Sequence, residues 1–181
     1  MSAPGFLCLQ PALLPDRLRA YAFLTQSDAT RCMMGPPDFS DHPIPTWAEF
    51  CADYGEGFFT PAGDGHGRLY MIRSDSRDVG CISYDGLEDW KGIAELDVWI
   101  ASSTDWGRGI GSRAVRELSQ QVLSHEGVES LLMRPSARNG RAIAAYRKAL
   151  SLNPEFSDAR NNLQRITQGA APVTSKTGGD R

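Results

Sequence analysis

Three glycines in the segment Trp106-Gly-Arg-Gly-Ile-Gly111 could form a binding site for an anion. The preceding residues 95–101 are mostly apolar and β-branched, as in a buried central strand, and apolar residues recur at helical spacing from Ile110 onward. Glycines lack a Cβ, so their N–H groups can approach a ligand closely, and the first turn of a helix adds partial positive charge. The sequence therefore predicts a strand, a turn and a helix that together hold a phosphate.

The spacing of the glycines excludes two common phosphate loops. A Walker loop requires a lysine, which this segment lacks, and a dinucleotide fingerprint requires glycine where the chain has Ser112. The segment instead resembles the acetyl-CoA pyrophosphate loop of the GNAT N-acetyltransferases, whose pattern is Gln/Arg-x-x-Gly-x-Gly/Ala after a strand. Trp106 departs from this pattern at the first position, although Trp-Gly-x-Gly is common in the branch that acetylates ribosomal-protein N-termini.

A second block strengthens the resemblance. The segment Asn139-Gly-Arg-Ala-Ile-Ala-Ala-Tyr-Arg-Lys-Ala149 is similar to the next signature of the superfamily, at the expected distance from the loop. The phrase around Asp97 looks most like aminoglycoside 6'-N-acetyltransferases, whereas the short connection between the preceding strands looks more like the ribosomal-protein branch. The resemblance implies an α/β fold with a mixed, mostly antiparallel sheet flanked by helices.

The resemblance also implies how acetyl-CoA is held. The backbone amides of residues 107–109, Gly111 and Ser112 would bind the pyrophosphate, and Asn139 would contact the pantetheine arm, although an asparagine before a helix is equally an N-cap. No metal is implied. The predicted cofactor contacts are Trp99, Ile100, Ala101, Trp106, Gly107, Arg108, Gly109, Ile110, Gly111, Ser112, Asn139, Arg141, Ala142 and Tyr146.

Acetyl transfer to an amine requires a base, because an ammonium group has no free lone pair at neutral pH. Asp97, just ahead of the loop, is the candidate base or the counter-ion that holds the ammonium, and Glu95 is the second candidate. Tyr146 matches the family tyrosine that can protonate the leaving thiolate. Each also has a structural interpretation: Asp97 could hydrogen-bond a neighbouring loop, and Tyr146 could pack in the core.

Other elements are expected to position this site, and they follow from local patterns. They are a strand at Phe6–Gln10, a helix from Pro15-Asp16, a proline-rich loop at 35–45, a helix capped by Thr46, a hairpin at 69–72 and 79–84, and a strand at Val128–Met133. By resemblance, the early helices and loops form much of the acceptor site. Aromatic residues there could line a pocket, although such residues are more often core.

The chain is predicted to contain one acetyltransferase domain at 1–150, a helical extension at 151–168 and a disordered tail at 169–181. Relatives have two more strands where this chain has a stripe of apolar residues at helical spacing, so the C-terminus is atypical. The 128–133 strand would then need cover from the terminal helix or from a second subunit, which makes a homodimer possible.

Composition is typical of a soluble domain: 181 residues, of which 41% are hydrophobic, with a net charge of −3. The four scattered cysteines and three histidines suggest neither a zinc site nor a disulfide framework, and we expect a reduced, cytoplasmic protein. The first fifteen residues, broken by three prolines, make a poor signal peptide, and we expect neither a membrane span nor a nucleic-acid patch.

Charge is distributed unevenly along the chain. Residues 36–105 hold fourteen Asp and Glu against four Lys and Arg, whereas residues 106–181 hold six acids against twelve bases. An acidic half attracts a cationic amine and a basic half attracts an anionic cofactor, unless both are only solvated faces. The sequence thus predicts acetyl transfer to a primary amine of a small cationic molecule such as an aminoglycoside. Protein N-termini are the second acceptor class, and a noncatalytic CoA-binding or helical interaction module is the alternative.

Overall fold

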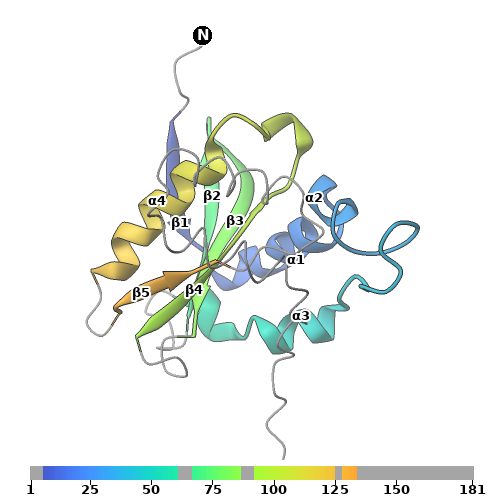
Figure 1. Cartoon of the computed structure of the whole chain (residues 1–181), viewed down its shortest axis with the longest axis horizontal. Coiled ribbons are helices and arrows are strands. Elements are labelled where there is room, and N and C mark those ends of the chain that lie inside the picture. Colours follow the sequence, from blue (N-terminus) through green and yellow to red (C-terminus); the bar gives the residue numbers. More distant parts are fainter. Residues whose placement is uncertain (1–5, 61–66, 87–91, 125–127, 134–181) are drawn as a thin grey trace, which may run out of the picture. The chain divides into compact units, whose positions relative to one another are not determined.

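A five-stranded sheet forms the centre of the protein (Figure 1). The computed structural model describes residues 6–60, 67–86, 92–124 and 128–133. The strands are β1 (Leu7–Pro11), β2 (Arg68–Ser74), β3 (Arg77–Asp85), β4 (Ile93–Ile100) and β5 (Ser130–Leu132). They lie in the order β1-β2-β3-β4-β5, and every pair is antiparallel except β4 and β5. The predicted mixed, mostly antiparallel sheet is confirmed.

Side chains cap three of the described helices, at Ser27, Thr46 and Ser102. The described helices are η1 (Leu14–Asp16), α1 (Arg17–Thr25), α2 (Asp28–Arg31), α3 (Trp47–Asp53), η2 (Glu56–Phe59), η3 (Ser103–Asp105) and α4 (Ile110–Leu123). At α3 the Thr46 Oγ1 accepts from the Glu49 N–H at 3.3 Å, and the Glu49 carboxylate accepts from the Thr46 N–H at 2.7 Å. This reciprocal capping confirms Thr46 as the predicted N-cap.

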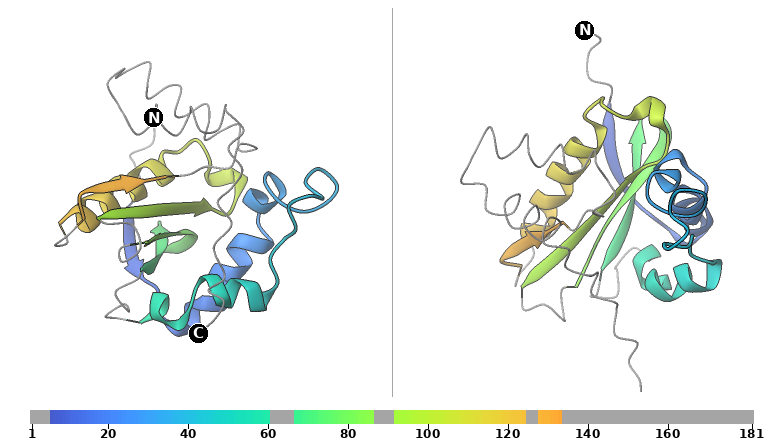
Figure 2. Two further views of the ribbon diagram at one scale, coloured as in Figure 1. Left: turned by 60° about the horizontal axis from the view of Figure 1, so that its bottom comes forward. Right: turned by 45° about the vertical axis from the view of Figure 1, so that its right-hand side comes forward.

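Helices cover both faces of the sheet, with α4 on one face and α1, α2 and α3 on the other (Figure 2). Because side chains alternate along a strand, each strand contributes to two cores. Leu96 packs with the buried face of α4, whose apolar residues are Ile110, Ala114, Leu118 and Val122. We call this the α4-side core. The opposite α1-side core combines Leu69, Met71 and Cys81 with Ala12, Ala20, Leu24, Phe50, Phe58 and Phe59.

The β2–β3 hairpin turns at Asp75 and Ser76, whose φ angles are 51° and 67°. Both central residues lie in the left-handed region, as a two-residue turn with the twist of a hairpin requires. Along β3, a Cβ on Gly80 would lie 1.9 Å from the Trp99 carbonyl oxygen of β4. Glycine at this position therefore allows β3 and β4 to approach closely.

The predicted elements agree with the structure except for one position. The strand that carries Asp97, expected at the centre of the sheet, is β4, which lies between β3 and β5, whereas β3 is the middle strand of the described sheet. The parallel pair β4 and β5 requires a crossover connection, which α4 supplies. The predicted helical extension at 151–168 and tail at 169–181 lie outside the described residues, as does the end of the predicted domain.

Candidate functional site

The segment between β4 and α4 is the predicted cofactor loop. The Trp106 side chain closes it, because its Nε1–H donates to the Ile100 carbonyl oxygen at 2.8 Å, at the end of β4. Gly107 and Gly109 adopt φ angles of 74° and 75°, and Gly109 is the N-cap of α4. A Cβ on either glycine would meet no atom within 4 Å in the described structure, so backbone conformation, rather than space, favours glycine here.

Amide groups gather at this helix start. Within the described residues, the N–H groups from Gly107 to Ser112 have no protein acceptor, and the first amide of this region that is bonded is that of Arg113, to the Gly109 carbonyl. Unpaired amides in the first turn carry the positive end of the helix dipole. The loop therefore offers the donors and the field that a diphosphate requires.

Asp105 anchors this loop, and sequence reasoning did not identify it. Its side chain is 1% exposed and accepts hydrogen bonds from both terminal nitrogens of Arg77, at 2.9 and 2.5 Å, and from Arg108 Nη1 at 2.8 Å. The Arg77 hydrogen bonds, followed by its charge and the contacts of Arg108, lower the pKa of Asp105, although burial opposes the shift. The charge of Arg108, which was predicted among the cofactor contacts, is thus partly neutralised by Asp105.

The edge of β4 that faces β5 is only partly paired. Among described residues, β5 pairs with Ile93–Glu95 alone. The Ala101 N–H donates to Val79 on the β3 side, and the Ala101 carbonyl accepts from Asp28 N–H, both at 3.0 Å. Backbone N–H and C=O groups of successive residues in a strand point to opposite neighbouring strands. The groups of Trp99 therefore point to β3, like the Ala101 N–H, whereas those of Val98 and Ile100 point to the β5 side. Among residues 98–101, Val98 and Ile100 are therefore the ones whose backbone faces the β5 side, and Val98 was not predicted.

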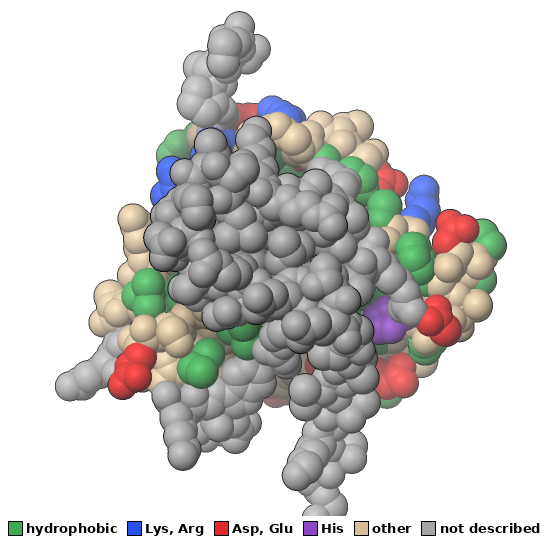
Figure 3. Space-filling model, in the orientation of Figure 1, with side chains coloured by type: hydrophobic (Ala, Val, Ile, Leu, Met, Phe, Trp, Pro, Cys, Tyr) green, Lys and Arg blue, Asp and Glu red, His purple; other side chains and the backbone are tan. Residues whose placement is uncertain are grey.

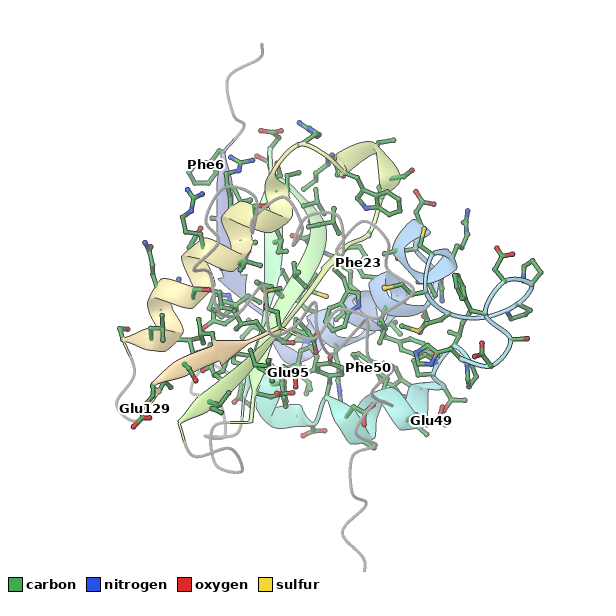
Figure 4. The ribbon with its side chains drawn as sticks, in the orientation of Figure 1. Phe6, Phe23, Glu49, Phe50, Glu95 and Glu129 are labelled. Carbon is green, nitrogen blue, oxygen red and sulfur yellow. The ribbon has the colours of Figure 1, made fainter. Side chains whose placement is uncertain are left out.

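Asp97 and Glu95 lie on the α1-side face of β4. They alternate with Leu96, which faces α4, and Trp99 on the same face packs against the α1-side core. Glu95 is 8% exposed, whereas Asp97 is partly exposed. Figure 4 labels Glu95 on β4 and Phe50 on α3. The two predicted carboxylates thus share one face of the sheet.

Tyr54, Cys81 and Ser83 surround Asp97 on this face. Ser83 is the β3 partner of Asp97. Burial, followed by the charge of Asp97, raises the pKa of Tyr54 well above its ordinary value, against an opposing hydrogen bond with the Ser83 side chain. The same two causes raise the pKa of the Cys81 thiol to about 12. Both groups are therefore neutral at pH 7, so neither the Tyr54 hydroxyl nor the Cys81 thiol adds a charge beside Asp97.

A chain of aromatic rings extends from this carboxylate across α3 and α1. Tyr54 meets Trp99 edge to face at 6.0 Å and stacks on Phe50 at 5.1 Å, and Phe50 stacks on Trp47 at 5.7 Å. Arg17 lies over Trp47 and donates to the Tyr54 carbonyl at 2.7 Å. The predicted aromatic residues of α3 thus contribute to both the core and the wall beside Asp97.

The acceptor-side helices are fastened to the loop by Asp28 at the start of α2. Its carboxylate accepts from the Ser103 N–H at 2.8 Å, which lowers the pKa of Asp28. An open hollow of about 380 Å³ lies here, between α1, α2 and the end of β4, lined in part by Phe23 and Ala101. A second cavity of about 300 Å³ lies between α2 and the proline-rich loop. In Figure 3, acidic side chains gather along the edge formed by that loop and α3.

Four predicted site residues, Asn139, Arg141, Ala142 and Tyr146, lie outside the described residues, so their roles stay predictions. The described part of the chain contains no cluster of three or more potential metal ligands. Its helices include none that is both long and apolar enough to cross a membrane. All four cysteines are free thiols.

Comparison with known proteins adds to this geometry. The family model described as the acetyltransferase (GNAT) domain matches residues 7–149. Curated protein sequences give no match. Several solved structures share the fold. The aminoglycoside acetyltransferase AAC(6')-Ib with coenzyme A aligns with a TM-score of 0.58 at 20% identity, over 80% of this chain and 83% of the other.

Two further structures show the same fold. An acetyltransferase from Thermus thermophilus aligns with a TM-score of 0.59 at 19% identity, over 82% of this chain and 88% of that protein. A chimera based on spermidine N-acetyltransferase SpeG from Vibrio cholerae aligns with a TM-score of 0.56 at 12% identity, over 78% and 77%. Because the family model covers most of the sequence and the sheet has the matching topology, this chain belongs to the GNAT acetyltransferases.

Proposed function

We propose that this acetyltransferase moves an acetyl group directly from acetyl-CoA to a primary amine of a small cationic molecule. The observation that carries the proposal is the row of amides from Gly107 to Ser112, which have no acceptor among the described residues and which follow the strand that presents Asp97 after a short connection. The row suits a diphosphate, and the adjacent carboxylate suits an ammonium group. The groups proposed to bind the cofactor and the amine therefore lie on β4 and on the connection that follows it.

The amide row would hold the pyrophosphate of acetyl-CoA, and the β5-facing backbone of Val98 would be available to the pantetheine arm. The Ile100 carbonyl is already used by the Trp106 indole, which fixes the start of the loop. In this proposal acetyl-CoA is bound mainly by backbone groups, whose positions are fixed by the strand and the helix.

Asp97 would take a proton from the ammonium, directly or through water, so that the amine nitrogen can attack the thioester carbonyl. The C–N bond forms as the C–S bond breaks, and the thiolate leaves with a proton that the family resemblance assigns to Tyr146. The nitrogen loses its second proton as the amide forms, and that proton restores the one given by Tyr146. Tyr54 and Cys81 remain protonated beside Asp97, so neither competes with it as a base. If Asp97 only anchors the ammonium, its loss affects acceptor binding instead of turnover.

The acidic and aromatic surroundings support a small cationic acceptor. Asp97 shares its face with Glu95, the rings of Tyr54 and Trp99 lie beside it, and aromatic faces attract cations. The structural neighbours include an aminoglycoside acetyltransferase and a spermidine N-acetyltransferase chimera. An aminoglycoside or polyamine is therefore the first acceptor class to test, and a protein N-terminus is the second.

The test is release of free CoA thiol from acetyl-CoA in the presence of an aminoglycoside, of spermidine, or of a short peptide with a free N-terminus. Each acceptor is paired with its fully N-acetylated form as the blank. We expect acceptor-dependent release with at least one small amine and little with the peptide. If only the peptide supports thiol release, the acceptor class is a protein N-terminus and not a small amine. If none of the three acceptors supports thiol release, the result counts against turnover of these amines.

A further inference from the structure

Asp105 is a buried carboxylate at the end of η3, one residue before the cofactor loop. We propose that Asp105 is a positioning residue for acetyl-CoA, which holds the loop in the conformation that presents its amide row. The inference rests on the proposed function, because it concerns how the same loop binds its ligand.

The contacts of Asp105 join the loop to the sheet. Arg77, at the start of β3, donates to both carboxylate oxygens, and Arg108, between the two left-handed glycines, donates to Oδ1. A buried carboxylate is stable only when such partners compensate for its lost hydration. The three residues thus form a clamp that spans the hairpin, the end of η3 and the middle of the loop.

The loop needs such a clamp because little else holds its middle. Gly107 and Gly109 are the residues least restricted in φ and ψ, and within the described residues their N–H groups have no protein acceptor. The Trp106 indole fixes the start of the loop, and α4 fixes its end. Between those two points, within the described residues, Arg108 is held by the buried Asp105 at 2.8 Å and lies 3.8 Å from the half-exposed Asp75. Fixing the loop before binding reduces the ordering cost that the ligand would otherwise meet.

A positioning role and a simple charge effect predict opposite changes in CoA affinity when the Asp105 carboxylate is neutralised. Asp105 offsets the charge of Arg108, so its removal makes the loop more positive, which by itself favours an anionic ligand. Removal also releases Arg108 and the loop backbone, which disfavours a preorganised amide row. The sign of the change in CoA affinity therefore separates a positioning role from simple charge.

Asp75 provides a matched control. Its carboxylate lies 3.8 Å from the Arg108 guanidinium, but it is half exposed and lies in the hairpin turn. Asp75→Asn removes the same charge near the same arginine without opening the buried clamp. We expect it to leave the Kd for CoA within about twofold of wild type, or to tighten binding slightly.

The experiment is calorimetric titration of CoA into the wild type, Asp105→Asn and Asp75→Asn, at temperatures well below each Tm. We expect Asp105→Asn to weaken CoA binding by about tenfold, since it loses charge-assisted hydrogen bonds that shape the loop. In turnover, the KM for acetyl-CoA should rise while kcat at saturation changes by less than about threefold. Equal or tighter CoA binding by a folded Asp105→Asn variant would overturn the inference.

Two further outcomes keep the inference separate from the proposed function. Wild-type protein that fails to bind CoA would overturn both. If Asp105→Asn does not fold, Arg77→Lys replaces it, because Arg77 is half exposed and lysine keeps the charge but cannot donate to both oxygens. We expect about threefold weaker CoA binding from this variant. Unchanged affinity in Arg77→Lys would contradict a clamp that positions the loop.

Discussion

Asp97 has a setting that suits a base or an ammonium anchor. It shares one face of β4 with Glu95 and Trp99, and its negative charge raises the pKa of both Tyr54 and Cys81. Those raised pKa values mean that the Tyr54 hydroxyl and the Cys81 thiol hold their protons at pH 7, so Asp97 is the most basic group of the three. Of these three groups, Asp97 is therefore the candidate for the proton transfer.

The first residue-scale prediction concerns Asp97→Asn, which keeps the size of the side chain but removes its charge and basic oxygen. Turnover should fall by about 10²- to 10⁴-fold, the usual contribution of a general base, with the Kd for CoA little changed. Steady-state kinetics with an acceptor found in the amine panel measure the effect. A rise in the acceptor KM with unchanged kcat would identify Asp97 as the anchor instead.

Glu95→Gln is the matched control, because Glu95 lies two residues earlier on the same face of the strand and is more buried. We expect its turnover to stay within about threefold of wild type. A large loss in Glu95→Gln with normal turnover in Asp97→Asn would exchange the two assignments.

At the scale of elements, the connection between β4 and α4 combines a left-handed glycine turn with a regular helix. Gly107 and Gly109 have left-handed conformations, whereas α4 buries a regular apolar stripe against the sheet. The helix fixes where the turn ends, and the Trp106 indole fixes where it begins. The amide row depends on both fixed ends and on the glycines between them.

The substitution Gly109→Ala tests whether the left-handed turn shapes the cofactor site. Because no atom of the described structure lies within 4 Å of the added Cβ, the cost is backbone strain of about 1–2 kcal/mol at a φ of 75°. The loop can relieve this strain by moving, which misaligns the amides, so we expect CoA affinity to fall by about tenfold. Thermal unfolding and calorimetry measure the two effects on the same protein.

Gly55→Ala is the control for this substitution. Gly55 has a φ of −60°, which alanine adopts without strain, and again no described atom lies within 4 Å of its added Cβ. Stability and CoA affinity should stay close to wild type. Equal CoA affinity in Gly109→Ala and Gly55→Ala would show that the left-handed turn does not shape the cofactor site.

Local patterns in the sequence predicted most of these elements. The apolar stripe of α4 and the Thr46 cap of α3 depend on neighbours within a few residues, so spacing alone identifies them. The Asp105–Arg77 pair was not predictable in this way, because its partners lie 28 residues apart and nothing distinguishes Asp105 from any loop acid. Tyr54 likewise reaches Asp97 only through the packing of α3 on the sheet.

At the scale of the whole molecule, the sheet separates two tasks. Its α4 side and the end of β4 provide the helix start for an anion, whereas its α1 side provides carboxylates and aromatic rings for a cation. Asp28, the first residue of α2, connects the two sides. Its backbone N–H donates to the Ala101 carbonyl oxygen, and its carboxylate accepts from the Ser103 N–H. In the proposed function, acetyl-CoA and the amine would approach β4 from these two sides and meet beside Asp97.

The central claim is direct transfer of acetyl from acetyl-CoA to an amine on this scaffold. Mass spectrometry of both the acceptor and the intact protein, after reaction of the wild type with acetyl-CoA, tests it most directly. The account predicts one acetyl group on the amine for each CoA thiol released, with the mass of the protein unchanged. Thiol release without acetylated amine, or an acetyl group retained on the protein as a reaction intermediate, would contradict it.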